Sequence, residues 1–117
     1  MAETTQLELV TPARVIVSKA AEMVVVPGTE GLFGVLPRHS ALLASLQRGV
    51  VEVYEGGKVI DRIMIDGGLA DVTPDGVTIL AERAVDLNNT SAQELQARAQ
   101  SASEAEAEFL NVAVEAI

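Results

Sequence analysis

Short apolar runs separated by turn residues fill the first three quarters of the chain. Their valines and isoleucines branch at Cβ, which favours extended backbone and packing on a pleated surface. Glu55-Gly56-Gly57-Lys58 and Thr73-Pro74-Asp75-Gly76 separate successive runs in the way hairpin turns do. The pattern predicts an antiparallel β-sandwich or flattened barrel, with strands in the runs 7–10, 15–17, 23–26, 49–54, 59–65 and 78–81.

Two stretches of this region depart from simple alternation. The run 23–26 is apolar on both faces, which is typical of a central strand or of an interface strand. Residues 27–43 carry three glycines, two prolines and the single histidine of the chain, so we expect an ordered, turn-rich segment there. We place Gly28, Gly34, Pro37, Gly67 and Gly68 in structural turns.

The pattern changes to a helical one after residue 86. Alanine, glutamate and glutamine dominate the remaining residues, and Ser91 and Glu94 have the spacing of a capping box. The segment fits one helix of roughly 25 residues or two shorter ones, and the absence of glycine and proline favours one. We therefore divide the chain into a β domain, residues 1–86, and a helical segment, residues 87–117. Its expected apolar stripe is rich in alanine, which predicts weak docking: Ala92, Leu95, Ala99, Ala102, Ala105, Phe109, Ala113 and Ala116.

The composition of the chain argues against several classes of function. The net charge of −9 argues against nucleic acid and against direct binding to anionic lipid, because both need basic partners. The chain has no cysteine, which excludes disulfides and thiolate metal sites. No apolar run approaches the ~20 residues that span a bilayer, and no signal peptide is recognisable at the N-terminus. We expect a cytoplasmic protein that reaches a membrane only through other proteins.

Catalytic groups are sparse. A triad would need His39 beside a serine and a carboxylate, but adjacent Ser40 would point away from it in an extended segment. His39 is better explained as a hydrogen-bonded structural residue or an interface residue. Glu30 is either a solvated carboxylate or a partner contact. Asp66-Gly67-Gly68 lacks the spaced oxygen ligands of a calcium loop, so we expect no metal and no cofactor.

Four ordered motifs resemble the epsilon subunits of F-type ATP synthases, called delta in mitochondria. The central one joins Pro27, Gly28, Gly31, Gly34, Val35, Pro37 and His39 to the leucine pair Leu42 and Leu43. The others are Leu7-x-x-Val10-Thr11-Pro12, then Gly67-Gly68-Leu69-x-x-Val72, and finally the run from Val77 to Ala84. The resemblance covers residues 7–85 in order.

The resemblance implies a ten-stranded β-sandwich followed by a pair of helices. It also implies a rotor subunit that joins the gamma subunit to the ring of c subunits and couples ion flow to ATP synthesis without catalysing it. The family's c-ring contact corresponds to Glu30 and Gly31. Its gamma contact corresponds to Val10, Thr11, Arg38, His39 and Leu42. The implied location is peripheral, on the cytoplasmic face of the bacterial inner membrane.

The chain departs from the family in three places. Leu32 stands where a glutamate is common, and only 33 residues follow Ala84. Some members bind ATP through a motif that contains an aspartate. The nearest match in this chain, residues 94–99, has Leu95 at the position of that aspartate. In the family the C-terminal helices can extend into the alpha/beta catalytic head and block hydrolysis, and that arm often carries basic residues that face acidic ones. Here residues 85–117 hold one arginine and no lysine. We therefore expect weak inhibition here.

A second interpretation gives the same fold a different function. A stand-alone sandwich could bind a small ligand or a carbohydrate. Sugar-binding modules stack rings on exposed aromatic side chains, however, and this chain has only Tyr54, Phe33 and Phe109. The rotor subunit is therefore the leading interpretation.

Overall fold

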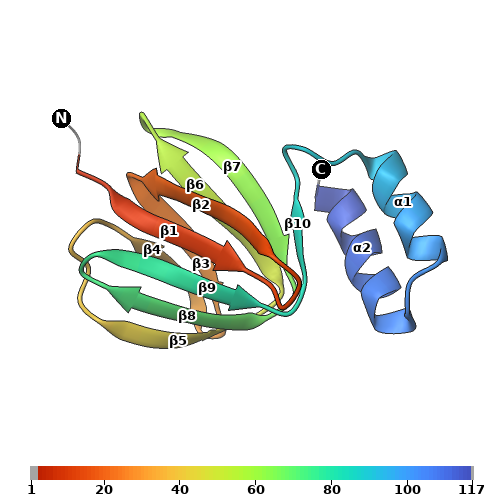
Figure 1. Ribbon diagram of the computed structural model, residues 1–117, viewed down its shortest axis with the longest axis horizontal. Coiled ribbons are helices and arrows are strands. Elements are labelled where there is room, and N and C mark those ends of the chain that lie inside the picture. Colours follow the sequence, from red (N-terminus) through yellow and green to blue (C-terminus); the bar gives the residue numbers. More distant parts are fainter. Residues whose placement is uncertain (1–2, 117) are drawn as a thin grey trace.

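Ten strands and two helices make up the computed structural model, which describes residues 3–116 (Figure 1). The strands are β1 Thr5–Val10, β2 Val15–Ala21, β3 Met23–Gly28, β4 Gly31–Val35, β5 Leu42–Leu46, β6 Gly49–Glu55, β7 Lys58–Ile65, β8 Gly68–Thr73, β9 Gly76–Ala81 and β10 Ala84–Asp86. The helices are α1 Ala92–Gln100 and α2 Glu104–Ala116. The sheet curls into a flattened barrel, and the helices lie together beyond one end of it (Figure 1). The predicted fold class is confirmed.

The strands form one curved sheet in the order β10-β7-β6-β3-β5-β8-β9-β1-β2, with β4 paired to β3. All pairs are antiparallel except one, because β1 runs parallel to β9. The first strand therefore lies between β2, which follows it in the sequence, and β9, which is about seventy residues further along the chain. The Lys19–Asp61 ion pair at 2.7 Å joins β2 to β7 across the seam between the ends of the sheet.

Alternating side chains build the barrel core. In β1, Thr5, Leu7 and Leu9 point inward while Gln6 and Glu8 are exposed. The buried cluster contains only aliphatic residues: Leu7, Leu9, Ala21, Val24, Val26, Val35, Leu46, Val51, Val53, Ile63, Ile65, Ala70, Val72, Val77, Ile79 and Ala81. Dispersion and close packing of these branched side chains make the barrel a rigid scaffold.

The predicted hairpins are present. Gly56 and Gly57 have φ values of +62° and +76°, so the β6–β7 turn needs two residues that tolerate positive φ. Pro74 and Asp75 lie between β8 and β9, where the Thr73 side-chain oxygen accepts from the Gly76 N–H. The apolar strand β3 is central, since it pairs with β4, β5 and β6.

The segment expected to be turn-rich contains two strands. Gly28 ends β3 and Gly34 lies inside β4, so the placement of these two glycines in turns is wrong. A Cβ added at Gly28 would lie 2.9 Å from the Gly31 carbonyl oxygen and 3.0 Å from the Phe33 ring. Gly28 is therefore needed for the close approach of β3 and β4 rather than for a turn. Pro37 does lie in the turn that follows β4.

The preference for one continuous helix is also wrong. Ser91 caps α1 by accepting from the Glu94 N–H, as predicted, but α1 ends at Gln100. Ser103 then caps α2, accepting from the Glu106 N–H at 3.3 Å. The break changes the helical phase, so Leu110 is buried and Ala105 is exposed. Folding α2 back on α1 lets Leu95, Phe109 and Leu110 share one core, which a straight helix could not form.

Candidate docking surface

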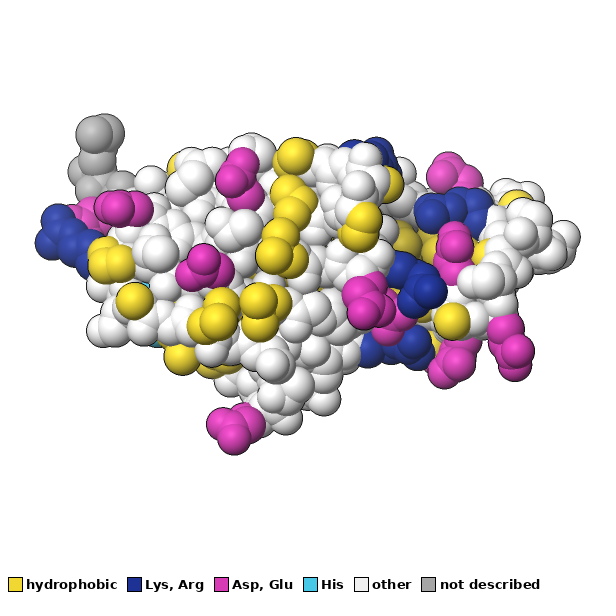
Figure 2. Space-filling view, turned by 60° about the horizontal axis from the view of Figure 1, so that its bottom comes forward, with side chains coloured by type: hydrophobic (Ala, Val, Ile, Leu, Met, Phe, Trp, Pro, Cys, Tyr) yellow, Lys and Arg dark blue, Asp and Glu magenta, His cyan; other side chains and the backbone are white. Residues whose placement is uncertain are grey.

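An apolar stripe crosses the outer face of the barrel. Leu69 pairs with Leu80, Leu80 with Val10, and Val10 with Val15, in consecutive strands β8, β9, β1 and β2. Cross-strand partners share one face, and the buried partners of this sheet alternate with them. Leu80 is 49% exposed and Val15 57% exposed. Figure 2 shows apolar side chains gathered across the middle of the barrel, with few charges among them.

A shallow groove lies beside this stripe. It has a volume of about 340 Å³ and is lined by Val10, Thr11, Pro12, Leu80, Ala81 and Glu82. The loop at its rim is closed by the Thr11 and Arg14 backbones, which hydrogen-bond to each other. Two of the expected gamma contacts, Val10 and Thr11, thus lie on an apolar, hollowed surface that a protein partner can fill.

A second exposed apolar region surrounds the β3–β4 hairpin and β5. Its leucines are Leu32, Leu36, Leu42 and Leu43, of which Leu32 is 71% exposed. Solvent-exposed leucines at this density on a small protein indicate contact with another molecule.

The tip of the β3–β4 hairpin carries the expected c-ring contacts. Glu30 lies in the tip, and Gly31 follows it with φ +128°, a conformation that favours glycine. The Thr29 N–H donates to the Ser45 carbonyl at 3.0 Å, and the Gln47 side-chain amide donates to the Gly28 carbonyl at 3.1 Å. These bonds fix the tip against β5, so Glu30 is presented to solvent from a rigid turn.

Arg38 and His39 lie at the other end of β5. Arg38 has φ +63°, and its backbone N–H donates to the Pro74 carbonyl in the β8–β9 turn. Its exposed guanidinium pairs with Glu3. The His39 Nδ1 lies 2.7 Å from the Ser40 carbonyl oxygen, so this nitrogen carries the proton. The ring is thereby held by the local backbone.

The five expected gamma contacts form two groups rather than one. Leu42 pairs with Val72, whereas Val10 pairs with Leu80, whose partner in β8 is Leu69. Val72 and Leu69 are three residues apart in β8, which corresponds to about 10 Å along the strand. This odd separation places buried Val72 and its partner Leu42 on the opposite face of the sheet from Leu69 and Leu80. The expected contacts are therefore divided between the Val10 end and the Arg38 end of the barrel.

Gly67 lies in the bend before β8, as expected, whereas Gly68 is the first residue of β8, so its placement in a turn is wrong. Their φ values are +74° and +143°. A Cβ at Gly68 would collide with the Leu80 carbonyl oxygen and lie 3.0 Å from the Ala81 Cα. Only glycine lets β8 approach β9 this closely, and that approach positions Leu69 beside Leu80.

A charged cluster joins the barrel to the helices. Asp66 accepts from the Arg48 Nε at 2.9 Å and from an Arg83 Nη at 2.7 Å. Burial raises the pKa of the Asp66 carboxyl, but the hydrogen bonds and charges of the two arginines outweigh it, and the net pKa is lowered. Arg48 also pairs with Glu108 of α2 at 3.4 Å.

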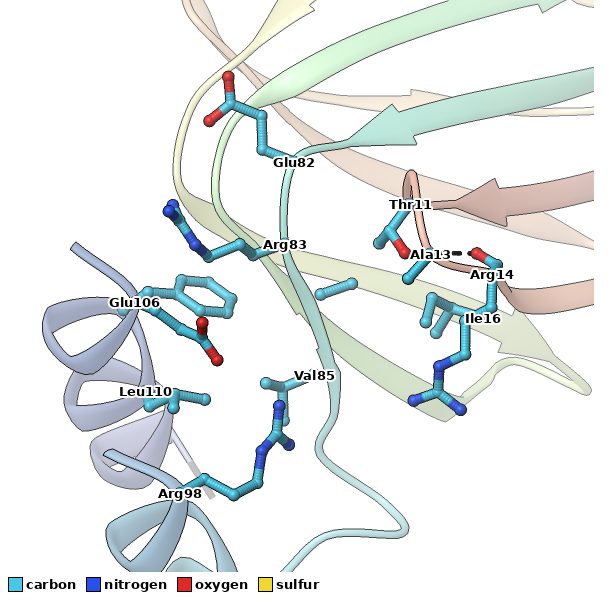
Figure 3. A pocket seen from close by; sticks show the side chains of 12 residues that line it. Thr11, Ala13, Arg14, Ile16, Glu82, Arg83, Val85, Arg98, Glu106 and Leu110 are labelled. Atoms are coloured by element: carbon cyan, nitrogen blue, oxygen red, sulfur yellow. Dashed lines mark hydrogen bonds between the residues drawn. The ribbon is translucent and has the colours of Figure 1, made fainter. Parts of the chain in front are cut away.

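A groove of about 200 Å³ separates the barrel from the helices (Figure 3). Arg14 lines it from the loop before β2, Arg83 from the loop before β10 and Arg98 from α1. Glu82 and Glu106 also line it. Arg98 extends toward Val85 in this view. Leu95, which replaces the aspartate of the nucleotide motif, is fully buried among the helices and points into their shared core.

Sequence reasoning missed Leu69, Leu80 and Val15. Their signal was an apolar side chain in the outward phase of a strand: Leu80 follows buried Ile79 and shares its face with Thr78. Such positions are normally polar on a one-sided sheet. Their alignment into one stripe depends on the register of four strands, including the parallel β1–β9 pair.

Comparison with known proteins identifies the family. Residues 4–87 match the family described as ATP synthase, Delta/Epsilon chain, beta-sandwich domain. The chain belongs to the delta/epsilon family of ATP synthases. The resemblance stated from the motifs is thus confirmed.

Relatives of this epsilon-family chain extend the match into the helices. It is 52% identical over 102 residues to the ATP synthase epsilon chain of Rhodospirillum rubrum, covering 87% of this chain and 76% of the relative. It is 42% identical over 105 residues to that of Paramagnetospirillum magneticum, covering 90% and 79%.

Solved structures agree. A chain in the Euglena gracilis mitochondrial ATP synthase structure, of OSCP, F1 and c-ring, matches with a TM-score of 0.67 and 30% identity, covering 96% of this chain and 76% of that one. A chain in the Tetrahymena thermophila central stalk and c-ring structure matches with a TM-score of 0.61 and 15% identity, covering 97% and 92%, and shows the shared fold alone.

These comparisons favour the ATP synthase interpretation over a stand-alone ligand-binding module. Within residues 3–116, neither helix is long and apolar enough to cross a bilayer. In the same part of the chain, no three His, Asp or Glu side chains come together as a candidate metal site.

Proposed function

We propose that this epsilon-family chain is a non-catalytic subunit of the rotor, joining the gamma subunit to the c-subunit ring. In this role it carries torque from ion flow to ATP synthesis, peripherally on the cytoplasmic face of the bacterial inner membrane. Residues 1–86 carry both contacts, and residues 87–117 form an appended helical segment with at most weak contact to the alpha/beta head. No cofactor is required for such a role.

The outer stripe is the observation that carries the gamma contact. Val10, Leu80 and Val15 are exposed or half-exposed on adjacent strands, and burying apolar surface of this kind is the main driving force of stable association. The rigid, aliphatic barrel beneath these side chains suits torque transmission. A force applied to the stripe acts on strands that are hydrogen-bonded to each other and closely packed, so the barrel deforms little. Arg38, His39 and Leu42 form the second half of the same interface.

Glu30 and Gly31 are the proposed c-ring contact. The fixed hairpin tip presents one carboxylate, and the neighbouring position holds exposed Leu32. The contact therefore combines one charge with an apolar side chain. An exposed ion pair of Glu30 would contribute at most about 1 kcal/mol. Shape complementarity of the tip should therefore contribute to binding as much as its charge does.

Leu80→Asp tests the gamma contact. A charge in the stripe should reduce the amount of gamma that co-purifies with the chain by at least about tenfold, because it would be buried without a partner. Val59→Asp is the matched control, since Val59 is also outward and 37% exposed but lies at the β6–β7 hairpin. Equal recovery of gamma with both folded variants would refute the stripe as the gamma contact.

Glu30→Lys tests the ring contact. In reconstituted membranes the variant should lower ATP-driven ion pumping, with a smaller effect at high salt because exposed charges are screened. Glu55→Lys, an exposed carboxylate at the opposite hairpin, serves as control. Unchanged pumping in Glu30→Lys membranes would remove Glu30 from the contact.

A further inference from the structure

Gly34 is a glycine that the fold of this chain does not require. It lies inside β4, pairs with Val25 of β3, and has extended backbone rather than a positive φ. A Cβ added there would lie 3.4 Å from the Met23 Sδ, which is an ordinary van der Waals contact with a flexible side chain. Glycine inside a strand destabilises it, because the backbone loses more freedom on folding and no side chain packs against its neighbours.

The other eight glycines of the chain each have a reason within the fold. Five of them have positive φ values, between +62° and +143°. A Cβ on any of the remaining three would come closer than 3.0 Å to a neighbouring atom: Gly28, Gly49 and Gly76. Gly34 therefore has its explanation outside the chain, since a glycine inside a strand also marks the place where another molecule approaches closely.

Exposed leucines flank Gly34 on the outer face of β4. Leu32 is 71% exposed, and Leu36, which follows the strand in the same phase, is 55% exposed. Phe33 and Val35 alternate with them and pack in the barrel core. Positions two apart in a strand are separated by about 7 Å, so the leucines stand on either side of the gap that the missing side chain leaves.

The other boundaries of this gap, which we call the Gly34 notch, are also apolar. Val25 is the cross-strand partner of Gly34, and the Met23 side chain reaches its edge; both are half-buried. Among the strands of residues 3–116, β4 pairs only with β3, so its other edge is open. An open apolar notch of this kind fits an apolar side chain of a partner, with the flanking leucines excluding water from the contact.

The notch is continuous with the proposed gamma contact, because β4 leads through exposed Leu36 directly to Arg38 and His39. We infer that Gly34 is a specificity-determining position of that contact. An apolar side chain of gamma lies on the Gly34 backbone between Leu32 and Leu36, where a larger residue in place of the glycine would exclude it. The inference rests on the proposed function, since it takes gamma as the occupant of the notch.

Side chains added at Gly34 separate binding from stability. Gly34→Ala and Gly34→Val should weaken the affinity of the full chain for an assembly of gamma with the alpha/beta head by about fivefold and about a hundredfold, because overpacking of the contact grows with side-chain size. The urea midpoint of each variant should stay unchanged or rise, since alanine and valine both restrict the unfolded chain and valine favours strands. Titration of the assembly without the c ring measures the affinity.

Two further variants complete the experiment. Ala20→Val, which adds a branched side chain at an exposed position of β2, is the matched control and should leave the affinity unchanged. Leu80→Asp reports on the gamma contact as a whole. If Leu80→Asp weakens binding and Gly34→Val does not, the notch inference is overturned while the proposed function stands. If neither variant weakens binding, both fail.

Other occupants of the notch give different results. A loss of binding confined to the c ring, measured with the complete complex, would overturn the inference. So would dimerisation of the wild-type chain that Gly34→Val abolishes, because the notch would then belong to a second copy of the chain. A lower urea midpoint for both Gly34 variants would overturn it too, since the glycine would then be required by the fold.

Discussion

At the scale of single residues, Thr5 combines burial with an unused hydroxyl. Its side chain is 1% exposed in the barrel core, and its Oγ1 has no hydrogen-bond partner among the described residues. A buried hydroxyl without a partner costs free energy, because it gives up its bonds to water.

Thr5→Val should therefore stabilise the protein. Valine has the same shape and the same preference for strands, so we expect the free energy of unfolding to rise by about 1 kcal/mol. Urea unfolding measures this difference. Thr4→Val, at an exposed neighbouring position, should change it little. A loss of stability in Thr5→Val would mean that the hydroxyl is satisfied in solution.

Asp66 makes the stability of the folded protein depend on pH in the acidic range. Its pKa in the folded state lies below the usual value of 3.8 through the hydrogen bonds of Arg48 and Arg83, which overcome burial. A depressed pKa contributes stability that is complete above the unfolded value and is lost as the pH falls through the folded one. The stability difference between wild type and Asp66→Asn should thus be constant above about pH 5 and shrink below about pH 4.

Unfolding titrations from pH 7 to pH 2 measure this difference. Contributions of the other carboxylates cancel when the two proteins are compared. Asp61→Asn, which removes the Lys19 pair instead, provides a comparison at the barrel seam. A difference for Asp66→Asn that stays constant down to pH 2 would contradict the role of the two arginines.

At the scale of elements, two turns with similar Gly-Gly sequences differ in how strictly they require glycine. Gly56 has φ +62° in open space, whereas Gly68 has φ +143° and faces the backbone of β9. Gly56→Ala should cost about 1 kcal/mol, the penalty of a left-handed alanine. Gly68→Ala should cost at least about 3 kcal/mol, because β8 must also move away from β9.

Denaturant midpoints of the two variants test this distinction. Equal losses would show that β8 can shift without penalty.

The break between the helices shows how packing acts together with local capping signals. Ser101 ends one helix and Ser103 begins the next, and the break permits a second core. Local capping signals were visible in the sequence, but the turn between them was decided by packing.

At the scale of the whole molecule, the helical segment carries little positive charge. Arg98 is the one basic residue among residues 85–117. Deleting residues 88–117 should leave ATP hydrolysis by the assembled enzyme nearly unchanged, because a segment with a single basic side chain has little positive charge with which to bind acidic surfaces. Hydrolysis rates of the complete enzyme with full-length and truncated chains measure this. A several-fold rise on truncation would show that the segment inhibits.

Much of the fold could be predicted from sequence, because its signals are local. Gly56-Gly57 marks a turn through backbone freedom, Ser91 marks a helix start through its side-chain oxygen, and alternation in Leu7 and Leu9 marks an inward face. The apolar stripe could not be predicted, because Leu80 and Val15 become neighbours only through Val10 and the parallel β1–β9 pair.

The sequence by itself determined the strand-rich body, the hairpins, the helical tail and the family, since each rests on neighbouring residues or on ordered motifs. Tertiary structure decided which outward side chains align, how far apart the two groups of proposed gamma contacts lie, and how Arg48 and Arg62 reach α2. These depend on pairs such as Arg48 with Glu108 and Arg62 with Ala116, which are more than fifty residues apart in the chain. Long-range pairing is fixed by the burial of the whole core, which no local stretch encodes.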